Sequence, residues 1–454
     1  MGALAASRRN ALLFVCSALA VFLLQPAMPI RQLDFWLPFA SLVLVTWTWA
    51  ATAPRAKAQD LRDGLALAAI VVLVALTRYV DPLSTTITRS RPPEIELVLI
   101  ALAAVAGVAF ILQRWHRPLL WWLGVAALIS VLVGLKLEPL ATALSAALRS
   151  AQGQSIAQAA AGDVRWLGIS YLTFRLIHVL REQLTGRLPP LSLREFVTYA
   201  VFFPAIVAGP IDRAERFMRD LRAPLALQWD DVIEGARRIA LGAFKKLVLA
   251  DSLALIALND ALAAQTRPGI WAWVIVYAFA LRLFLDFSGY TDIAIGIARW
   301  CGVRLPENFD RPYLKPNLTM FWNSWHMTLA QWFRVHYFTP LTRALRQRGM
   351  PPWAIIAFGQ LSTMLLIGLW HGISANFAIW GLWHGVGLFV HNRWVEFARG
   401  HLSLESLPPL MQRAWQVAST LLTFHFVTLG WVWFALSTPA LALRMFAAMI
   451  GLQI

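Results

Sequence analysis

Charged side chains are scarce in this chain of 454 residues. They make up 14% of the residues, and hydrophobic residues make up 59%. A soluble globular domain carries about 25% charged residues, and here long apolar runs recur from one end of the chain to the other. This composition excludes an ordinary soluble fold and predicts an all-α polytopic integral membrane protein, with no stretch polar enough to form a separate soluble domain.

Cysteine is also nearly absent, with only Cys16 and Cys301, both in apolar surroundings. Two such residues exclude a disulfide framework and a cysteine-rich metal site. The sequence contains no G-x-S-x-G nucleophile motif, no phosphate-binding P-loop, and no histidine pair spaced four residues apart beside a carboxylate. We therefore expect no bound metal and no nucleotide cofactor.

Acidic residues are fewer than basic ones, 24 against 40, which gives a net charge of +16. The basic residues cluster between apolar runs, as in Arg8-Arg9, Arg237-Arg238 and the stretch from Arg343 to Arg348. In a membrane protein such clusters indicate juxtamembrane anchors that favour anionic lipid, so no nucleic-acid partner is expected. A docking surface for an acidic cytoplasmic partner is the alternative interpretation.

The apolar runs predict roughly ten or eleven membrane crossings, plus one or two re-entrant or interfacial pieces. An N-terminal run after Arg8-Arg9 resembles a signal peptide, but further apolar segments follow at once, which favours an uncleaved first span. Residues 139–163 are expected to form a loop with a weak helix. The other expected spans are 35–52, 62–80, 94–113, 117–135, 270–300, 354–371, 375–394 and 414–436, followed by a final apolar run from Pro439.

Two segments combine apolar runs with polar or helix-breaking residues. Segment 166–181 carries Arg175 and His178, and segment 196–212 contains Pro204, Gly209 and Pro210. Proline and glycine interrupt a helix, and broken backbone at membrane depth is tolerated only inside protein or beside a wet cavity. Segment 196–212 is therefore predicted to be buried or re-entrant.

The later span 270–300 contains two carboxylates, Asp286 and Asp292. Because they are six residues apart, we expect them on opposite sides of a continuous helix. The proline-rich stretch PENFDRPYLKPN that follows (306–317) is expected to be an irregular connection.

Most of the polar chemistry lies between Pro306 and Gly385. His326 stands among Trp322, Asn323 and Trp325, while His371 and His384 each belong to a Trp-His-Gly triplet. Histidine is the natural general base near neutral pH, and an ionisable side chain within the membrane marks a functional site. The alternative for any one of them is a hydrogen-bonded packing residue.

The two Trp-His-Gly histidines are thirteen residues apart, which is about 220° around an unbroken helix, so they would not converge on one face. The intervening Gly-Ile-Ser-Ala-Asn stretch predicts a break instead. His371, which precedes Gly372, is expected at a helix end with space beside it.

The string ENFDRPYLKPNLTMFWNSWHMTLAQWFRVHYFTPL (307–341), followed by GLWHG (368–372), resembles the membrane-bound O-acyltransferase family. The similarity is to the bacterial branch that contains the teichoic-acid D-alanyl transferase and the alginate O-acetyltransferase. It extends to GISYLTFR (168–175), FFPAIVAGPIDRAERF (202–217) and FLDFSGYTDIAIGIA (284–298), and covers roughly 165–390. WNSWHM and AGPIDR favour the D-alanyl transferase side.

The resemblance implies a funnel-like helical bundle in a bacterial cytoplasmic (inner) membrane. The family moves an acyl group, here D-alanyl or acetyl, from a cytoplasmic thioester to a hydroxyl of a cell-envelope polymer. The donor would be a carrier-protein phosphopantetheine thioester or a coenzyme A thioester. The acceptor side would be the polymer itself or an extracytoplasmic partner transferase.

By motif match, His371 takes the family's catalytic role and His326 is the second family histidine. Acyl transfer to an alcohol needs a base for the hydroxyl proton and a polar site for the developing oxyanion. We expect His371 to be the base, with Asn323 and His326 as candidates for the oxyanion site or for orienting substrate. The expected substrate-binding residues are Asn323, Trp322, Trp325 and Trp370. The sequence departs from the family after WFR, where Val335-His336 replaces the frequent Asp-Tyr or Asp-Phe.

We divide the chain into N-terminal membrane helices without a recognisable motif (1–163), a catalytic core (164–395) and C-terminal membrane helices (396–454). A multi-pass transporter of an envelope precursor or acyl group is the main alternative, since broken helices with midplane polar residues suit transport. A transporter would predict an internal repeat, and only the short Trp-His-Gly echo is found. A non-catalytic scaffold for envelope-polymer assembly is disfavoured by the intact His326 and His371.

Overall fold

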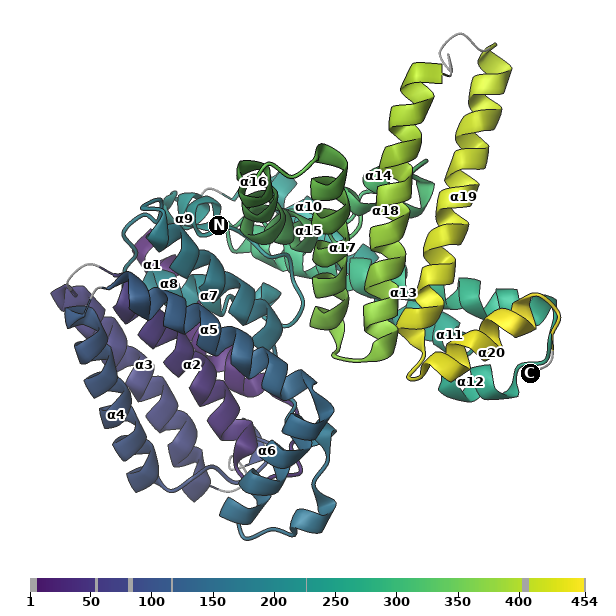
Figure 1. Cartoon of the computed structure of the whole chain (residues 1–454). Coiled ribbons are helices and arrows are strands. Elements are labelled where there is room, and N and C mark those ends of the chain that lie inside the picture. The colour runs from purple at the N-terminus through teal and green to yellow at the C-terminus, as the bar shows by residue number, and fades with distance from the viewer. Residues whose placement is uncertain are drawn as a thin grey trace. The chain divides into compact units, whose positions relative to one another are not determined.

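Helices account for nearly all the regular structure of the computed structural model, which describes residues 6–53, 56–80, 85–115, 117–225, 227–401 and 408–452 (Figure 1). In this part of the chain the only β pairing is an isolated antiparallel bridge between Phe309 and Trp325. The all-α prediction is confirmed. The chain packs as two compact units, unit 1 (Met1–Arg237 with Ala294–Pro306) and unit 2 (Arg238–Ile293 with Glu307–Ile454). The three sequence segments proposed above divide the chain differently and stay a prediction.

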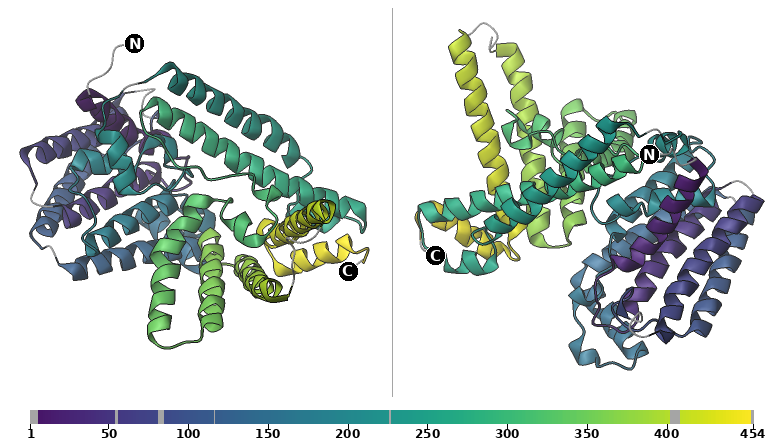
Figure 2. Two further views of the ribbon diagram at one scale, coloured as in Figure 1. Left: turned by 90° about the horizontal axis from the view of Figure 1, so that it is seen from above. Right: turned by 180° about the vertical axis from the view of Figure 1, so that it is seen from behind.

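Unit 1 is a helical bundle, seen from two further directions in Figure 2. The second helix lies at its centre and packs against the first, fourth, fifth, seventh and eighth. Its helices are α1 (Ala6–Leu23), α2 (Leu33–Thr52), α3 (Ala58–Leu76), α4 (Ile95–Arg114), α5 (Pro118–Lys136), α6 (Glu138–Ala151), α7 (Ile169–Leu184), α8 (Leu193–Ala200) and α9 (Ala214–Arg222).

Unit 2 contains the region rich in histidine and tryptophan. Its long helices are the greater part of α13 (Ile270–Trp300), α17 (Pro352–His371), α18 (Ala375–His401) and α19 (Pro409–Ala435). Shorter helices connect them: α11 (Asp251–Ala254), α12 (Asp260–Gln265), α14 (Leu318–Trp322), α15 (Met327–Phe333), α16 (Thr339–Gln347) and α20 (Pro439–Met449). Helix α10 (Trp229–Ala243) crosses the boundary between the units.

Six of the described helices are long and apolar enough to cross a membrane: α2, α4, α5, α13, α17 and α19. The prediction of ten or eleven crossings also counted α1, α3, α18 and the final run from Pro439, which forms the short apolar helix α20. Helix α3 begins with Asp60, Arg62 and Asp63, and α18 contains three histidines, so both are more polar than the six.

The expected helix break in segment 196–212 is present and buried. Helix α8 ends at Ala200, and only the 3₁₀ turn Phe203–Ala205 follows before α9. Arg175, which is 3% exposed, donates one hydrogen bond to the Ala200 carbonyl and one to the Ala205 carbonyl, both of 2.9 Å. A fixed guanidinium fork thereby satisfies acceptors that a continuous helix would have paired.

The start of α7 lies against the same broken segment. Gly168 has φ +68°, and a Cβ at this position would lie 2.5 Å from the Ile206 carbonyl oxygen. Only glycine combines this left-handed backbone with so close an approach. His178, one helical turn beyond Arg175, accepts a 3.2 Å hydrogen bond from the Ala214 N–H. Arg175 and His178, the two polar residues of segment 166–181, therefore hold the broken segment against α7 through hydrogen bonds.

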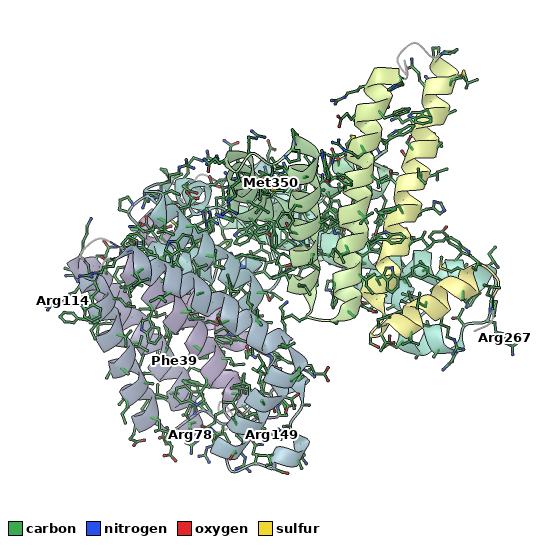
Figure 3. All side chains as sticks on the ribbon, in the orientation of Figure 1. Phe39, Arg78, Arg114, Arg149, Arg267 and Met350 are labelled. Atoms are coloured by element: carbon green, nitrogen blue, oxygen red, sulfur yellow. The ribbon has the colours of Figure 1, made fainter. Side chains whose placement is uncertain are left out.

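Segment 139–163 forms α6 and a loop that an ion pair closes onto it. Arg149, labelled in Figure 3, donates from Nε to Asp163 Oδ2 at 2.9 Å, and the Ser145 hydroxyl donates to the same carboxylate at 2.6 Å. Burial acts to raise the pKa of Asp163, but these bonds and the Ala160 N–H outweigh it, so the pKa is lowered.

The expectation that the two carboxylates of α13 lie on opposite sides of the helix is wrong. Asp286 pairs with Lys246, and Asp292 pairs with Lys245 at 2.7 Å and with Arg238 at 3.2 Å. Both lysines belong to one π-helical stretch (Phe244–Ala250). Six residues advance a helix by about 600°, which leaves the two side chains only about 120° apart, so both reach the same neighbouring helix.

Candidate active site

The two Trp-His-Gly motifs lie on α17 and α18, which pack against each other as a hairpin. A Cβ on Gly368 would lie 2.2 Å from the Phe377 carbonyl oxygen, and a Cβ on Gly381 would lie 2.5 Å from the Met364 carbonyl oxygen. The first glycine of each GLWHG motif thus lets two helix backbones approach closely, as small residues do in membrane bundles. The predicted break between the motifs is the short connection from Gly372 to Ser374.

His371 is the last residue of α17, at the helix end predicted from the sequence. Its imidazole is half-buried among aromatic rings, with ring centroids 4.6 Å from Trp370, 4.9 Å from Phe434 and 5.4 Å from Trp380. Phe377 stacks at 6.1 Å. His371 therefore has largely apolar, aromatic surroundings and stays partly exposed.

His326 lies on an irregular loop in a strained conformation. Its backbone has φ +41° and ψ +53°, in the left-handed region that residues other than glycine rarely occupy. The residue is 2% exposed. Asn308 holds the turn that follows: its carbonyl accepts from the Met327 N–H at 3.0 Å, and its Oδ1 accepts from the Thr328 hydroxyl at 2.6 Å. Strain held by surrounding bonds is typical of functional loops.

The PENFDRPY stretch explains how that loop is fixed. It runs antiparallel to the NSWH stretch, through the Phe309–Trp325 bridge and a 3.0 Å bond from the Asp310 N–H to the Ser324 carbonyl. The two motifs noticed in the sequence are thus one structural element, with His326 at its end.

Trp370 contacts both family histidines. Its ring centroid lies 4.6 Å from that of His371 and 6.3 Å from that of His326. The His326 ring also meets Phe287 of α13 edge-on at 4.7 Å. The structure therefore brings His371, His326 and Trp370 into one aromatic cluster.

Trp322 joins this cluster from the other side. It lies 6.0 Å from Trp380 and 5.2 Å from His384. His384 is fully buried, and no described residue forms a hydrogen bond with either of its ring nitrogens. The ring centroid of His384 lies 5.1 Å from that of Trp380 and 5.9 Å from that of Phe426, so His384 belongs to the packed interior.

Asn323 and Trp325 have different surroundings. Asn323 is exposed, accepts a 2.6 Å hydrogen bond from Arg334, and lines a cavity of about 200 Å³ together with Trp322. Trp325 is 5% exposed and packs against Trp431 at 5.0 Å and Phe309 at 5.2 Å. Trp325 therefore supports the loop, whereas Asn323 faces a space.

A polar cavity of about 390 Å³ lies beside the same loop. Its charged lining residues are Lys245, Asp292, Glu307, Asp310 and Arg311. A 2.8 Å hydrogen bond from Lys315 lowers the pKa of Asp310. Among the described residues, no cluster of three or more His, Cys, Asp or Glu side chains could hold a metal ion.

Sequence reasoning missed two aromatic neighbours of His371. Phe434 comes from α19, 63 residues further along the chain, and Trp380 from the second turn of α18. Neither belongs to a motif, and only their aromatic character within apolar helices was visible. The Val335-His336 departure lies in a π-helical turn (Arg334–Phe338), where His336 is buried against Trp332 at 4.8 Å. Such turns occur frequently at functional sites.

A protein family model matches more than half of the chain. The model of MBOAT, the membrane-bound O-acyltransferase family, matches residues 115–401, which begins earlier than the motifs noticed in the sequence. The matched range contains the residues described above except Phe426, Trp431 and Phe434 of α19.

Curated relatives are acyl-transfer proteins of three kinds. A teichoic acid D-alanyltransferase of Bacillus subtilis is 30% identical over 280 residues, which cover 60% of this chain and 69% of the relative. A probable alginate O-acetylase of Pseudomonas syringae pv. tomato is 32% identical over 291 residues, 63% of this chain and 52% of the relative. A peptidoglycan O-acetyltransferase of Helicobacter pylori is 33% identical over 269 residues, 58% of this chain and 48% of the relative.

The chain thus spans about two thirds of the first relative and about half of the other two. The family match covers more than half of the chain, and the matched relatives share the acyltransferase activity. The protein is a membrane acyltransferase of the membrane-bound O-acyltransferase family.

Proposed function

We propose that the protein transfers a D-alanyl or acetyl group from a cytoplasmic thioester to a hydroxyl of a cell-envelope polymer, with His371 as general base. The observation that carries the proposal is the partly accessible imidazole at the end of α17, inside the family-matched range. His326 and His384 are both buried, so His371 is the family-motif histidine with access for a substrate hydroxyl.

The reaction follows from that placement. His371 takes the proton of the acceptor hydroxyl as its oxygen attacks the thioester carbonyl, the carbon–sulfur bond breaks, and the imidazolium returns the proton to the leaving thiolate. The carbonyl end of α17 points at this residue, and the negative end of a helix dipole stabilises a cation formed there. Aromatic walls exclude water and so protect the thioester from hydrolysis.

The oxyanion site is assigned to the loop that carries His326. Asn323 Oδ1 already accepts from Arg334, which orients the amide so that its NH₂ is the end that donates to substrate. His326 is held by a strained, hydrogen-bonded turn, and such pre-organisation is what a developing negative charge requires. Trp370 and Trp322 would then form walls around the acyl group. Trp325 would pack against the loop and support it.

The donor side is assigned to the three arginines Arg343, Arg346 and Arg348, called here the α16 arginines. The first two lie on α16 and the third directly follows it, so they form one helical surface. All three are exposed, and no described carboxylate pairs with them. They suit an acidic carrier protein or the phosphates of coenzyme A.

The names of the relatives refer to teichoic acid, alginate and peptidoglycan. We assign this protein to acceptors of the same class, cell-envelope polymers, reached directly or through an extracytoplasmic partner transferase, in a bacterial cytoplasmic membrane. The family match supports acyl transfer over the alternative of a transporter.

Reconstitution tests the proposal. The purified protein in proteoliposomes is supplied with labelled D-alanyl or acetyl thioesters of a carrier protein and of coenzyme A on one side, and with a hydroxyl-bearing envelope polymer on the other. We expect label on the polymer from one donor class and none in protein-free vesicles. Label that crosses the membrane as free acyl compound, without esterifying any acceptor, would contradict the proposal and favour transport.

A further inference from the structure

A large groove lies between α18 and α19, and His371 is not among the residues that line it. The two helices run side by side (Figure 1) and touch where Trp383 stacks on Phe426 at 4.9 Å and donates a 3.0 Å hydrogen bond to its carbonyl. From this contact a cavity of about 1650 Å³ follows the pair to Arg399 on α18 and Trp415 on α19. Most of its lining is apolar.

The groove has one permanently charged lining residue, Arg399, which lies at its outer end. His391 is its other titratable lining residue, and no carboxylate in the described part of the chain lines it. The nearest acid in sequence, Glu396, is outside the lining and pairs with Arg393 at 2.6 Å. The groove is therefore mostly apolar, with a positive charge at its mouth, which fits an anionic amphiphile.

Two tryptophans mark the level of that mouth in the membrane. Trp394 and Trp415 both line the groove and are 43% and 44% exposed. Helix α18 rises about 27 Å from Asn376 to Trp394, and α19 about 30 Å from Trp415 to Ala435, which both match a hydrocarbon core of about 30 Å. Tryptophan prefers the membrane interface, so Arg399, about 7 Å further along α18, lies at headgroup level.

The depth of the groove distinguishes its occupant. On α19 the lining runs from Trp415 to Phe426, which is about 16 Å or one leaflet. On α18 it runs from Ile379 to Arg399, about 30 Å, so the groove has walls from both helices only on the outer side of the Trp383–Phe426 contact. A spanning partner helix would need both walls over about twice that length.

We propose that this groove binds one anionic glycerophospholipid of the surrounding bilayer. An acyl chain lies along the apolar stripe between the helices, and Arg399 binds the phosphate at the mouth. At its base the groove reaches Leu318 of α14, the short helix that ends in Trp322, so the bound lipid supports the segment beside the candidate site. This site is independent of the proposed reaction.

Native mass spectrometry tests the headgroup assignment. The detergent-purified full chain is titrated with phosphatidylglycerol or phosphatidylcholine of equal chain length. We expect one tightly held phosphatidylglycerol, and about fivefold weaker binding in Arg399→Gln, the effect of one basic residue on an anionic lipid. Arg413→Gln is the matched control, because Arg413 is exposed on α19 and outside the lining, and should bind as the wild type does.

Two further variants test the groove itself. Val390→Trp, which fills it, should lose phosphatidylglycerol binding while melting at a temperature close to that of the wild type. A photoreactive benzophenone at Leu422, which is 74% exposed and lines the groove, should crosslink to phospholipid in membranes. Equal binding of the two lipids, equal losses in Arg399→Gln and Arg413→Gln, or a crosslink to a polypeptide or a lipid-linked glycan would overturn the proposal.

Discussion

Gly368→Ala should displace His371 without removing any catalytic atom. The added Cβ would lie 2.2 Å from the Phe377 carbonyl oxygen, so the backbone must move by about 1.2 Å to reach an ordinary contact of 3.4 Å. Overpacking of this kind costs about 1–3 kcal/mol of stability. Gly368 also lies one helical turn before His371, so the shift reaches the base, and a misplacement of about 1 Å costs about 100-fold in rate.

The assay compares turnover and melting temperature of the purified variant with those of Gly134→Ala. Gly134 lies in α5, where a Cβ would meet nothing within 4 Å. Because alanine is the better helix former, this control should be neutral or stabilised by up to about 1 kcal/mol, with wild-type turnover. Wild-type turnover and melting temperature in Gly368→Ala would refute the claim that close packing of α17 on α18 positions His371.

Three further predictions concern other parts of the chain. Arg175→Met should lower the unfolding free energy by about 2–6 kcal/mol in denaturant titrations, because it leaves the buried Ala200 and Ala205 carbonyls without this donor, and Arg175→Lys should lose less. The lowered pKa of Asp163 means that its ion pair with Arg149 stabilises the fold above the unfolded pKa of about 3.9 and is lost as pH falls through the lower folded value. The melting temperature of Asp163→Asn should therefore be lower at neutral pH and depend less on pH below about 4. Replacing the α16 arginines with glutamine should raise the donor KM and flatten its dependence on salt, with turnover at saturation little changed; an unchanged KM with impaired membrane orientation would make them a topology signal only.

Local features of the sequence predicted much of this fold, because apolar runs and helix breakers act over short distances. Pro204, Gly209 and Pro210 located the break after α8, and Gly372 located the end of α17 beside His371. The partner of the break, Arg175, was visible only as a polar residue in an apolar segment, since hydrogen bonds to distant carbonyls leave no pattern in the chain.

Features that depend on tertiary packing could not be predicted. The expectation for Asp286 and Asp292 was wrong because six residues leave two side chains only about 120° apart on a helix, and their basic partners, Lys245 and Lys246 of a distant π-helical stretch, could not be identified from the sequence. The wall residue Phe434 comes from a helix with no motif, and nothing near it in sequence indicates a contact with His371. Motifs in the sequence thus located the histidines, and packing between distant helices determined their surroundings.

The most direct test of the account is the turnover of His371→Ala in proteoliposomes with saturating donor and acceptor. The account predicts a loss of about 10²–10⁴-fold, the usual contribution of a general base, with an unchanged melting temperature. His401→Ala, which removes an exposed histidine at the end of α18, is the matched control and should retain full activity. Near wild-type turnover in His371→Ala would contradict the assignment of this residue as the base.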